Sequence, residues 1–210
     1  MDGVLADTGE IHFESWVKMA REINVEFTKE FFNETFGQQS PTITKKLVGD
    51  KFDEKKIIEL ANRKERYYRD LVKDKLKPLP GVLDLLTELK KYNFKLAVGS
   101  SGPPENVDLL LKTLKIKDLF DVIITAADVD KSKPHPDVFL KVSEKLNISP
   151  DKCIVIEDAP VGIEAARRAG MRSIALTTTH DYKELIDADL VVKDLSHVSI
   201  DDIITLFGIN

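Results

Sequence analysis

The chain has 210 residues, 42% of them hydrophobic and 7% aromatic, which is enough to bury one sizeable core and to carry a smaller accessory unit. A net charge of -5 excludes a general attraction to nucleic acid or anionic lipid, and no apolar run is long enough to span a bilayer or to serve as a secretory signal. The single cysteine, Cys153, excludes an intrachain disulfide, so we expect a soluble protein of the cytoplasm.

The first part of the chain predicts a short polar opening followed by a helical block. The chain opens with MDGVLADTGE, in which Asp2 stands beside a glycine. Residues 10–76 are expected to be entirely helical, because apolar residues recur at helical spacing over residues 13–23 and again near residues 57–61. The Leu-Pro-Gly at residues 79–81 then marks the end of this block.

Short apolar runs alternate with amphipathic stretches in the rest of the chain. The runs predict buried parallel strands at residues 94–99, 121–126, 152–157, 172–177 and 189–193. Helical faces between them are formed by Val107, Leu110, Leu111 and Leu114, and by Val138, Val142 and Leu146. This alternation predicts a doubly wound α/β fold, whose functional site lies at the carboxyl ends of the strands. Cys153 falls within the third run and is expected to be a buried filler.

Polar residues follow each of the first three runs. Ser100-Ser101-Gly102 follows the first, Lys133 lies in the loop after the second, and Glu157 and Asp158 end the third. A hydroxyl with neighbouring backbone N–H groups can hold phosphate oxygens, and a lysine can neutralise the same anion. Adjacent carboxylates are typical ligands of Mg²⁺. These groups are the ones that phosphoryl transfer requires.

Each of these pieces also has a plain structural interpretation. The Ser-Ser-Gly sequence is typical of a helix N-cap, Lys133 of an exposed surface charge, and an Asp before Ala-Pro of a turn. The functional interpretation is favoured because all three pieces follow consecutive predicted strands, which a doubly wound sheet brings together.

Four segments resemble the motifs of the haloacid dehalogenase (HAD) superfamily of phosphotransferases, in its branch of β-phosphoglucomutase and sugar-phosphate phosphatases. MDGVLADT resembles the end of the first motif, D-x-D-G-V-x-D-T, and VGSS, KSKPHPDVF and VIEDAPVGIEAARRAGM resemble the other three in order. The likeness covers nearly the whole chain. It implies a Rossmann-like α/β core at residues 1–9 and 77–210, with a helical cap at residues 10–76 inserted after the first motif.

The resemblance also implies roles for individual residues. In this family the first aspartate of D-x-D forms an aspartyl-phosphate, and the second, matched by Asp2, is the general acid and base. The implied catalytic residues are Asp2, Ser100, Lys133 and His12. The implied substrate-binding residues are Ser101, Gly102 and Lys64. The implied Mg²⁺ ligands are Asp2, Glu157 and Asp158.

The first motif is incomplete in this chain. Met1 stands at the x of D-x-D, so the nucleophilic aspartate would lie immediately before residue 1, at the end of an apolar strand. We therefore expect a truncated start and little or no activity, with a natural pseudoenzyme as the alternative. In this family the absent strand lies between the runs at residues 94–99 and 152–157, so we expect a gap between these two strands and a poorly stable chain.

The resemblance implies that the helical block closes over the site. His12 and Lys64 match cap residues that assist the acid–base aspartate, although His12 could simply lie on a helix face and Lys64 could be a solvated charge in NRKERYYRD. Ser40 aligns where β-phosphoglucomutase carries an arginine for a second phosphate. This difference favours hydrolysis over a mutase reaction, unless Lys45 or Lys46 substitutes for the arginine.

Three functional hypotheses result. The leading one is a Mg²⁺-dependent phosphatase, expected to be a monomer, that acts on a small phosphorylated metabolite such as a sugar phosphate. The second is a β-phosphoglucomutase. The third is a non-catalytic binding or regulatory protein that retains the HAD fold.

Overall fold

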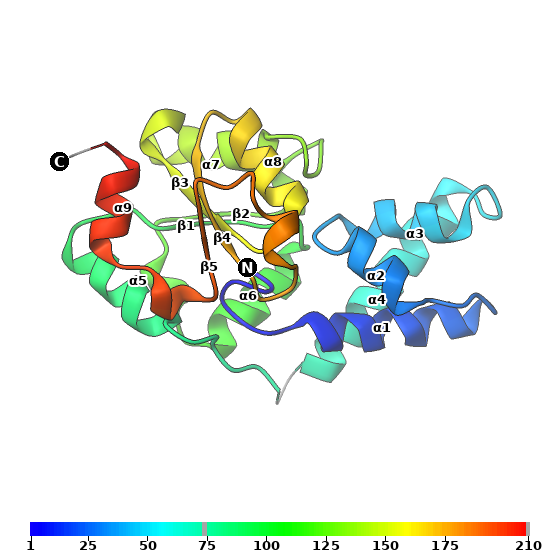
Figure 1. Cartoon of the computed structure of the whole chain (residues 1–210). Helices are drawn as coiled ribbons and strands as arrows, with labels where there is room; N and C mark the ends of the chain where they lie inside the picture. Colours follow the sequence, from blue (N-terminus) through cyan, green and yellow to red (C-terminus); the bar gives the residue numbers. More distant parts are fainter. Residues whose placement is uncertain (73–74, 209–210) are drawn as a thin grey trace.

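The computed structural model describes residues 1–72 and 75–208 and contains two parts, a helical unit and an α/β unit (Figure 1). The helical unit consists of α1 (Gly9–Glu22), α2 (Lys29–Thr35), α3 (Ser40–Val48) and α4 (Glu54–Val72). The helical prediction for residues 10–76 is confirmed as far as Val72, and residues 73–74 of this stretch lie outside the described residues. The other helices are α5 (Val82–Lys91), α6 (Pro104–Thr113), α7 (Asp137–Leu146), α8 (Pro160–Arg168) and α9 (Ile200–Leu206). None of the helices within the described ranges is long and apolar enough to cross a membrane.

The helical unit has an aromatic core of its own. Trp16 of α1 is 2% exposed and stacks on Phe27, with ring centroids 5.2 Å apart. Phe32 of α2 and Leu60 of α4 belong to the same buried cluster. The helix α2 begins at Thr28, whose side chain accepts a hydrogen bond from the backbone of Phe31. Side chains of α1, α2 and α4 thus pack into one core around Trp16.

The strands of the α/β unit lie where the apolar runs predicted them, each somewhat shorter than its run. They are β1 (Ala97–Gly99), β2 (Val122–Ile124), β3 (Ile154–Glu157), β4 (Arg172–Leu176) and β5 (Leu190–Val192). β1 pairs with β2 in parallel, and β3, β4 and β5 form a second parallel sheet in that order. Short 3-10 helices occur at Lys117–Leu119, Ala126–Asp128, Pro150–Lys152, Tyr182–Glu184 and Leu195–His197.

A gap separates β1 from β3. Among the described residues these two strands belong to different sheets and are not paired with each other, which confirms the expected gap. A cavity of about 290 Å³ lies between them, lined by both strands and by apolar side chains of α5, α7 and α9. We call this cavity the central slot.

Helices cover both faces of the strands, with α7 and α8 on one side and α5 and α6 on the other (Figure 1). Side chains alternate between the two faces. Ile154 and Ile156 pack on the cluster that contains α5, α6 and α9, whereas Val155 packs on the cluster that contains α7 and α8. Cys153, expected to be buried, is only half-buried because it lines the central slot.

Candidate active site

A cavity of about 80 Å³ lies between the helical unit and the carboxyl ends of β1 and β3. Its lining includes every residue to which the sequence assigned a role, namely Asp2, His12, Lys64, Ser100, Ser101, Gly102, Lys133, Glu157 and Asp158. The predicted convergence of residues from distant segments on one cleft is confirmed by this cavity. The role of each residue stays a prediction, which the local geometry supports to different degrees.

Asp2 is carried on a tight turn at the start of the chain. The backbone N–H of Gly3 donates to the carbonyl of Ala6 at 2.9 Å, and a hydrogen bond of 2.8 Å joins the N–H of Leu5 to the carbonyl of Met1. Gly3 has a φ of 66°, and a Cβ on it would collide with the carboxylate of Asp158. A glycine is therefore required here both by the positive φ and by the close approach of its backbone to the carboxylate of Asp158.

A chain of hydrogen bonds leads from the helical unit to Asp2. The Nζ of Lys64 donates to the Nδ1 of His12 at 2.7 Å, and the Nε2 of His12 lies 3.3 Å from Asp2. Because an ammonium group only donates, Nδ1 accepts and Nε2 carries the proton that faces Asp2. Lys64 is 2% exposed, so the solvated-charge interpretation of this residue is wrong. The ring of His12 is also held by stacking on Tyr68, with centroids 4.0 Å apart.

These contacts keep Asp2 ionised. Burial alone would raise the pKa of Asp2, but attraction to His12 and hydrogen bonds from His12 and Thr8 hold its pKa well below the ordinary value. The hydroxyl of Thr8 donates to the carboxylate at 2.6 Å. Asp2 is therefore poised to accept a proton and is linked to a group, His12, that can supply one.

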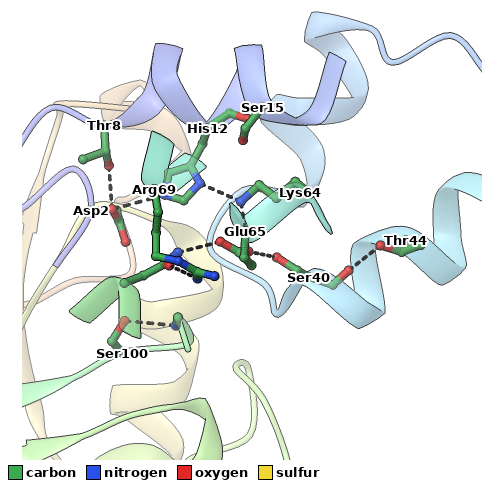
Figure 2. A network of polar contacts seen from close by, with 12 residues as sticks. Asp2, Thr8, His12, Ser15, Ser40, Thr44, Lys64, Glu65, Arg69 and Ser100 are labelled. Atoms are coloured by element: carbon green, nitrogen blue, oxygen red, sulfur yellow. Dashed lines mark hydrogen bonds and ion pairs between the residues drawn. The ribbon is translucent and has the colours of Figure 1, made fainter. Parts of the chain in front are cut away.

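Glu65 connects the helical unit to the α/β unit (Figure 2). Its buried carboxylate accepts hydrogen bonds from Ser40, from Lys64 at 3.0 Å and from Asn106 of α6 at 2.5 Å. Arg69 of α4 donates in turn to Asn106 at 2.9 Å. Burial would raise the pKa of Glu65, but Lys64 and the other donors keep it below its usual range. No sequence pattern pointed to Glu65, because Ser40 and Asn106 lie far from it along the chain.

Ser100 and Lys133 form the polar wall at the end of β1. The hydroxyl of Ser100 accepts a hydrogen bond from the N–H of Gly102 at 3.0 Å. The N-cap of α6 is Pro103, without a side-chain capping bond, so the N-cap interpretation of the Ser-Ser-Gly segment is wrong. Lys133 is 7% exposed and is not a surface charge, since its Nζ donates to the carbonyl of Gly99 at 3.3 Å and pairs with Glu157.

The pKa values of two neighbouring carboxylates at the end of β3 are shifted in opposite directions. Burial and repulsion by Glu157 raise the pKa of Asp158 to about 7, although the hydroxyl of Thr179 donates to it at 2.5 Å. Burial opposes the ionisation of Glu157 too, but Lys133 keeps the pKa of Glu157 below its usual value. A cation bound beside these two carboxylates would favour the ionised form of Asp158.

The predicted three-carboxylate metal site is not assembled in this structure. Within residues 1–72 and 75–208, no three His, Cys, Asp or Glu side chains are grouped so that they could hold a metal ion. Each predicted ligand has turned to another partner: Asp2 to Thr8 and His12, Glu157 to Lys133, and Asp158 to Thr179. The role of Asp2, Glu157 and Asp158 as Mg²⁺ ligands stays a prediction; the pair at the end of β3 fits Mg²⁺ because this ion often binds through one or two carboxylates plus substrate and water.

Two residues of the site were missed in the sequence. Thr179 bonds the carboxylate of Asp158, and the Nδ1 of His180 lies 3.0 Å from the backbone carbonyl of Asp158. Both follow β4, at the same edge of the sheet as the other site residues. Their position after the fourth apolar run was a usable signal, because polar residues after the first three runs had already been singled out by the same rule.

Comparison with known proteins identifies the family. The family model described as haloacid dehalogenase-like hydrolase matches residues 1–176. The chain belongs to this family. It is 33% identical over 198 residues to validoxylamine A 7'-phosphate phosphatase of Streptomyces hygroscopicus subsp. limoneus, covering 94% of this chain and 92% of that HAD protein. It is 34% identical over 209 residues to β-phosphoglucomutase of Bacillus subtilis (strain 168), covering 96% and 90%.

A solved structure supports the same assignment. The crystal structure of β-phosphoglucomutase from Clostridium difficile superimposes with a TM-score of 0.89 at 30% identity, covering 99% of this chain and 94% of that one. The expected HAD fold, an α/β core with a helical cap, is thereby confirmed, and the helical unit is this cap. With phosphatase and mutase relatives of this kind, the chain is an enzyme of the HAD phosphatase and phosphotransferase type.

Proposed function

We propose that the protein hydrolyses the phosphate monoester of a small, sugar-like metabolite with the help of Mg²⁺ and through an aspartyl-phosphate intermediate. The observation that carries the proposal is the meeting of two groups in one cavity: the proton-handling pair Asp2 and His12, and the phosphate-binding pair Ser100 and Lys133. We also propose that residues 10–76 form a separate cap domain over a core made of residues 1–9 and 77–210.

The first half of the reaction transfers the phosphoryl group to the enzyme. A carboxylate oxygen forms a bond to phosphorus while the bond from phosphorus to the substrate oxygen breaks. The leaving oxygen takes a proton from Asp2, which receives it through the contact with His12 at 3.3 Å. Lys133 and the N–H groups around Gly102 would hold the phosphate oxygens.

The second half returns the enzyme to its starting state. Asp2 takes a proton from water and passes it back to His12, the water oxygen bonds to phosphorus, and the acyl phosphate bond breaks to release inorganic phosphate and the free carboxylate. The helical unit covers the cavity and would exclude other nucleophiles. Glu157 and Asp158 would hold Mg²⁺, which supplies positive charge to the phosphoryl oxygens when it is bound.

The attacking carboxylate is a separate group in this proposal. Asp2, Glu157 and Asp158 are each engaged by another partner in the cavity, as described above. We propose that the nucleophile is an aspartate that lies just before Met1, at the carboxyl end of a strand in the central slot. Met1 lines both the slot and the active-site cavity, so such an aspartate would face Asp2 across the site.

The cap side of the cavity supports hydrolysis over a mutase reaction. Ser40 lines the cavity and donates to Glu65, so the position that aligns with the mutase arginine carries a neutral side chain beside a carboxylate. Lys45 pairs with Asp50 and Lys46 with Gln38, and neither lysine lines the cavity. A second phosphate would meet the negative charge of Glu65 there, whereas sugar hydroxyls could donate to it.

A fusion protein tests the function. An apolar strand ending in Asp is placed directly before Met1, and phosphate release is measured with glucose 1-phosphate and glucose 6-phosphate, with and without Mg²⁺. We expect Mg²⁺-dependent phosphate release, and a loss of at least about 100-fold in the fusion that ends in Asn. Conversion of glucose 1-phosphate to glucose 6-phosphate without phosphate release would instead identify a mutase.

A further inference from the structure

The helical side of the active-site cavity contains a buried carboxylate that takes no part in the proposed reaction steps. Glu65 of α4 is 6% exposed and lines the cavity. Its Oε1 accepts hydrogen bonds from Ser40 and Lys64, and its Oε2 accepts one from Asn106. A carboxylate has about four acceptor positions. Donors from the described part of the chain fill three of them, so Oε2 can still accept a hydrogen bond from a ligand.

Glu65 is held at a fixed place relative to the segment that would bind phosphate. Its partner Asn106 lies on α6, which begins just after the Ser100–Gly102 segment. Arg69 of α4 donates to the Oδ1 of Asn106 at 2.9 Å. Because a guanidinium only donates, the Oδ1 of Asn106 must face Arg69, and its Nδ2 then faces Glu65. These contacts set the separation between Glu65 and the backbone N–H groups around Gly102.

The cavity offers no free lysine or arginine to a second anionic group. Within residues 1–72 and 75–208, no arginine lines the cavity, and the two lysines that line it are buried. Lys64 pairs with Glu65 at 3.0 Å, and Lys133 pairs with Glu157 at the opposite wall. A phosphate or carboxylate placed beside Glu65 would therefore meet a like charge in a site that is shielded from water, where repulsion is strong.

The remaining surface of this wall is neutral. Phe36 and Ile43 give it an apolar part. Gln38 also lines the cavity, and its Oε1 accepts from Lys46 at 2.8 Å, so its Nε2 keeps donors for a ligand. An apolar surface with a few fixed polar groups is typical of a small-molecule site. One acceptor and one donor beside such a surface fit the hydroxyls and C–H groups of a polyhydroxylated ring.

We propose that Glu65 is the specificity-determining residue of the cavity. Its carboxylate accepts a hydrogen bond from a ring hydroxyl of a neutral, polyhydroxylated phosphate monoester, and it rejects esters that carry a second anionic group beside it. The inference rests on the proposed function, because it names the substrate class of the same site. Glu65 selects the ligand and takes no proton in the reaction.

A double-mutant cycle between protein and ligand tests the hydrogen bond. The ligands are glucose 6-phosphate and cyclohexylmethyl phosphate, which keeps the six-membered ring and the phosphate but has no hydroxyl. Their dissociation constants for the full chain are measured by isothermal titration calorimetry with Mg²⁺ present. Glu65→Gln should lower the preference for glucose 6-phosphate over cyclohexylmethyl phosphate at least about tenfold, because only the sugar donates to the carboxylate.

A bisphosphate tests the rejection of a second anion. The unsubstituted protein should bind glucose 6-phosphate at least about tenfold more tightly than glucose 1,6-bisphosphate, and Glu65→Gln should reduce this preference to about threefold or less. The first of these measurements decides the matter even if the variant does not fold. Glu59→Gln is the matched control, because Glu59 lies on the same helix but is exposed, pairs with Lys56 and does not line the cavity. It should leave both preferences unchanged.

The outcomes separate this inference from the proposed function. Equal preferences in the unsubstituted protein and in Glu65→Gln overturn the role of Glu65, even if the fusion protein releases phosphate. Absence of glucose 6-phosphate binding, or tighter binding of the bisphosphate by the unsubstituted protein, overturns it as well. The expected preferences together with a fusion protein that releases no phosphate support the role of Glu65 in ligand selection and contradict the proposed function.

Discussion

The helical unit and the parallel sheet differ in how complete they are. The helices α1–α4 close a core around Trp16 and Leu60, both of which are at most 2% exposed. The sheet is divided by a cavity of about 290 Å³ between β1 and β3. Helices satisfy their own backbone groups, whereas each strand depends on neighbours that come from distant parts of the chain. A missing strand between β1 and β3 therefore leaves the sheet incomplete, whereas the packing of the helical unit does not depend on it.

Two buried ion pairs give the comparison with the largest expected effect on stability. Lys133 pairs with Glu157 at the end of the sheet, and Lys64 pairs with Glu65 in the helical unit. Lys133→Met should lower the free energy of unfolding by about 3–5 kcal/mol, because Glu157 keeps only a hydrogen bond of 3.3 Å from the N–H of Asp158. Lys64→Met should cost about 1–3 kcal/mol, because Glu65 still accepts from Ser40 and Asn106. Urea unfolding of both variants measures the difference. A larger loss of stability for Lys64→Met than for Lys133→Met would contradict this prediction.

A matched pair of leucines tests packing in the two regions. Leu60 is 0% exposed in the helical core, and Leu89, which is 6% exposed, lines the central slot. Leu60→Ala should cost about 4–5 kcal/mol and Leu89→Ala about 2–3 kcal/mol, because a side chain beside an existing cavity has fewer contacts to lose. Equal losses in the free energy of unfolding of the two variants, measured by thermal or urea unfolding, would contradict this difference in packing.

The charge of Asp158 predicts a smaller, pH-dependent effect at the open end of the sheet. The pKa of Asp158 is about 7 in the folded protein against an ordinary value of 3.8, so the folded state holds this proton more tightly than the unfolded state. The stability that protonated Asp158 contributes to the folded state is therefore lost as the pH rises from about 4 to about 7. Asp158→Asn should remove this loss and raise the free energy of unfolding at pH 8 by at least about 1 kcal/mol, with little change at pH 4.

Mg²⁺ provides the control for that prediction. If Glu157 and Asp158 hold the ion, Mg²⁺ should stabilise the unsubstituted protein at pH 8 and not the Asp158→Asn variant. Thermal unfolding with Mg²⁺ and with a chelator measures both. Equal stabilisation of the two proteins would place the ion elsewhere.

Much of the fold and part of the site could be predicted from local sequence patterns. The spacing of apolar residues predicted the helical unit and the five strands, and the rule for strand ends located Ser100, Lys133 and Asp158. The gap could not be found from periodicity, because the pattern of a strand does not say which strand lies beside it. It came from the incomplete first motif, D-x-D-G-V-x-D-T.

The contacts that position the predicted residues could not be predicted in the same way. Lys64 stands in a run of charged residues, and its burial arises from the packing of α4 against α1. Glu65 meets Ser40 and Asn106, which are 25 and 41 residues away in sequence. Such contacts exist only after the helical unit has packed and docked on α6.

Native-state hydrogen exchange of the chain, without the fused strand, tests the difference between the two regions most directly. We predict that amides of α1 and α4 exchange slowly, that those of the central strand β4 do so as well, and that about half of the amides of β1 and β3 exchange much faster because they face the central slot. Slow exchange throughout β1 and β3, at the rate of β4, would show that these strands have partners on both sides and would contradict the account of an open sheet.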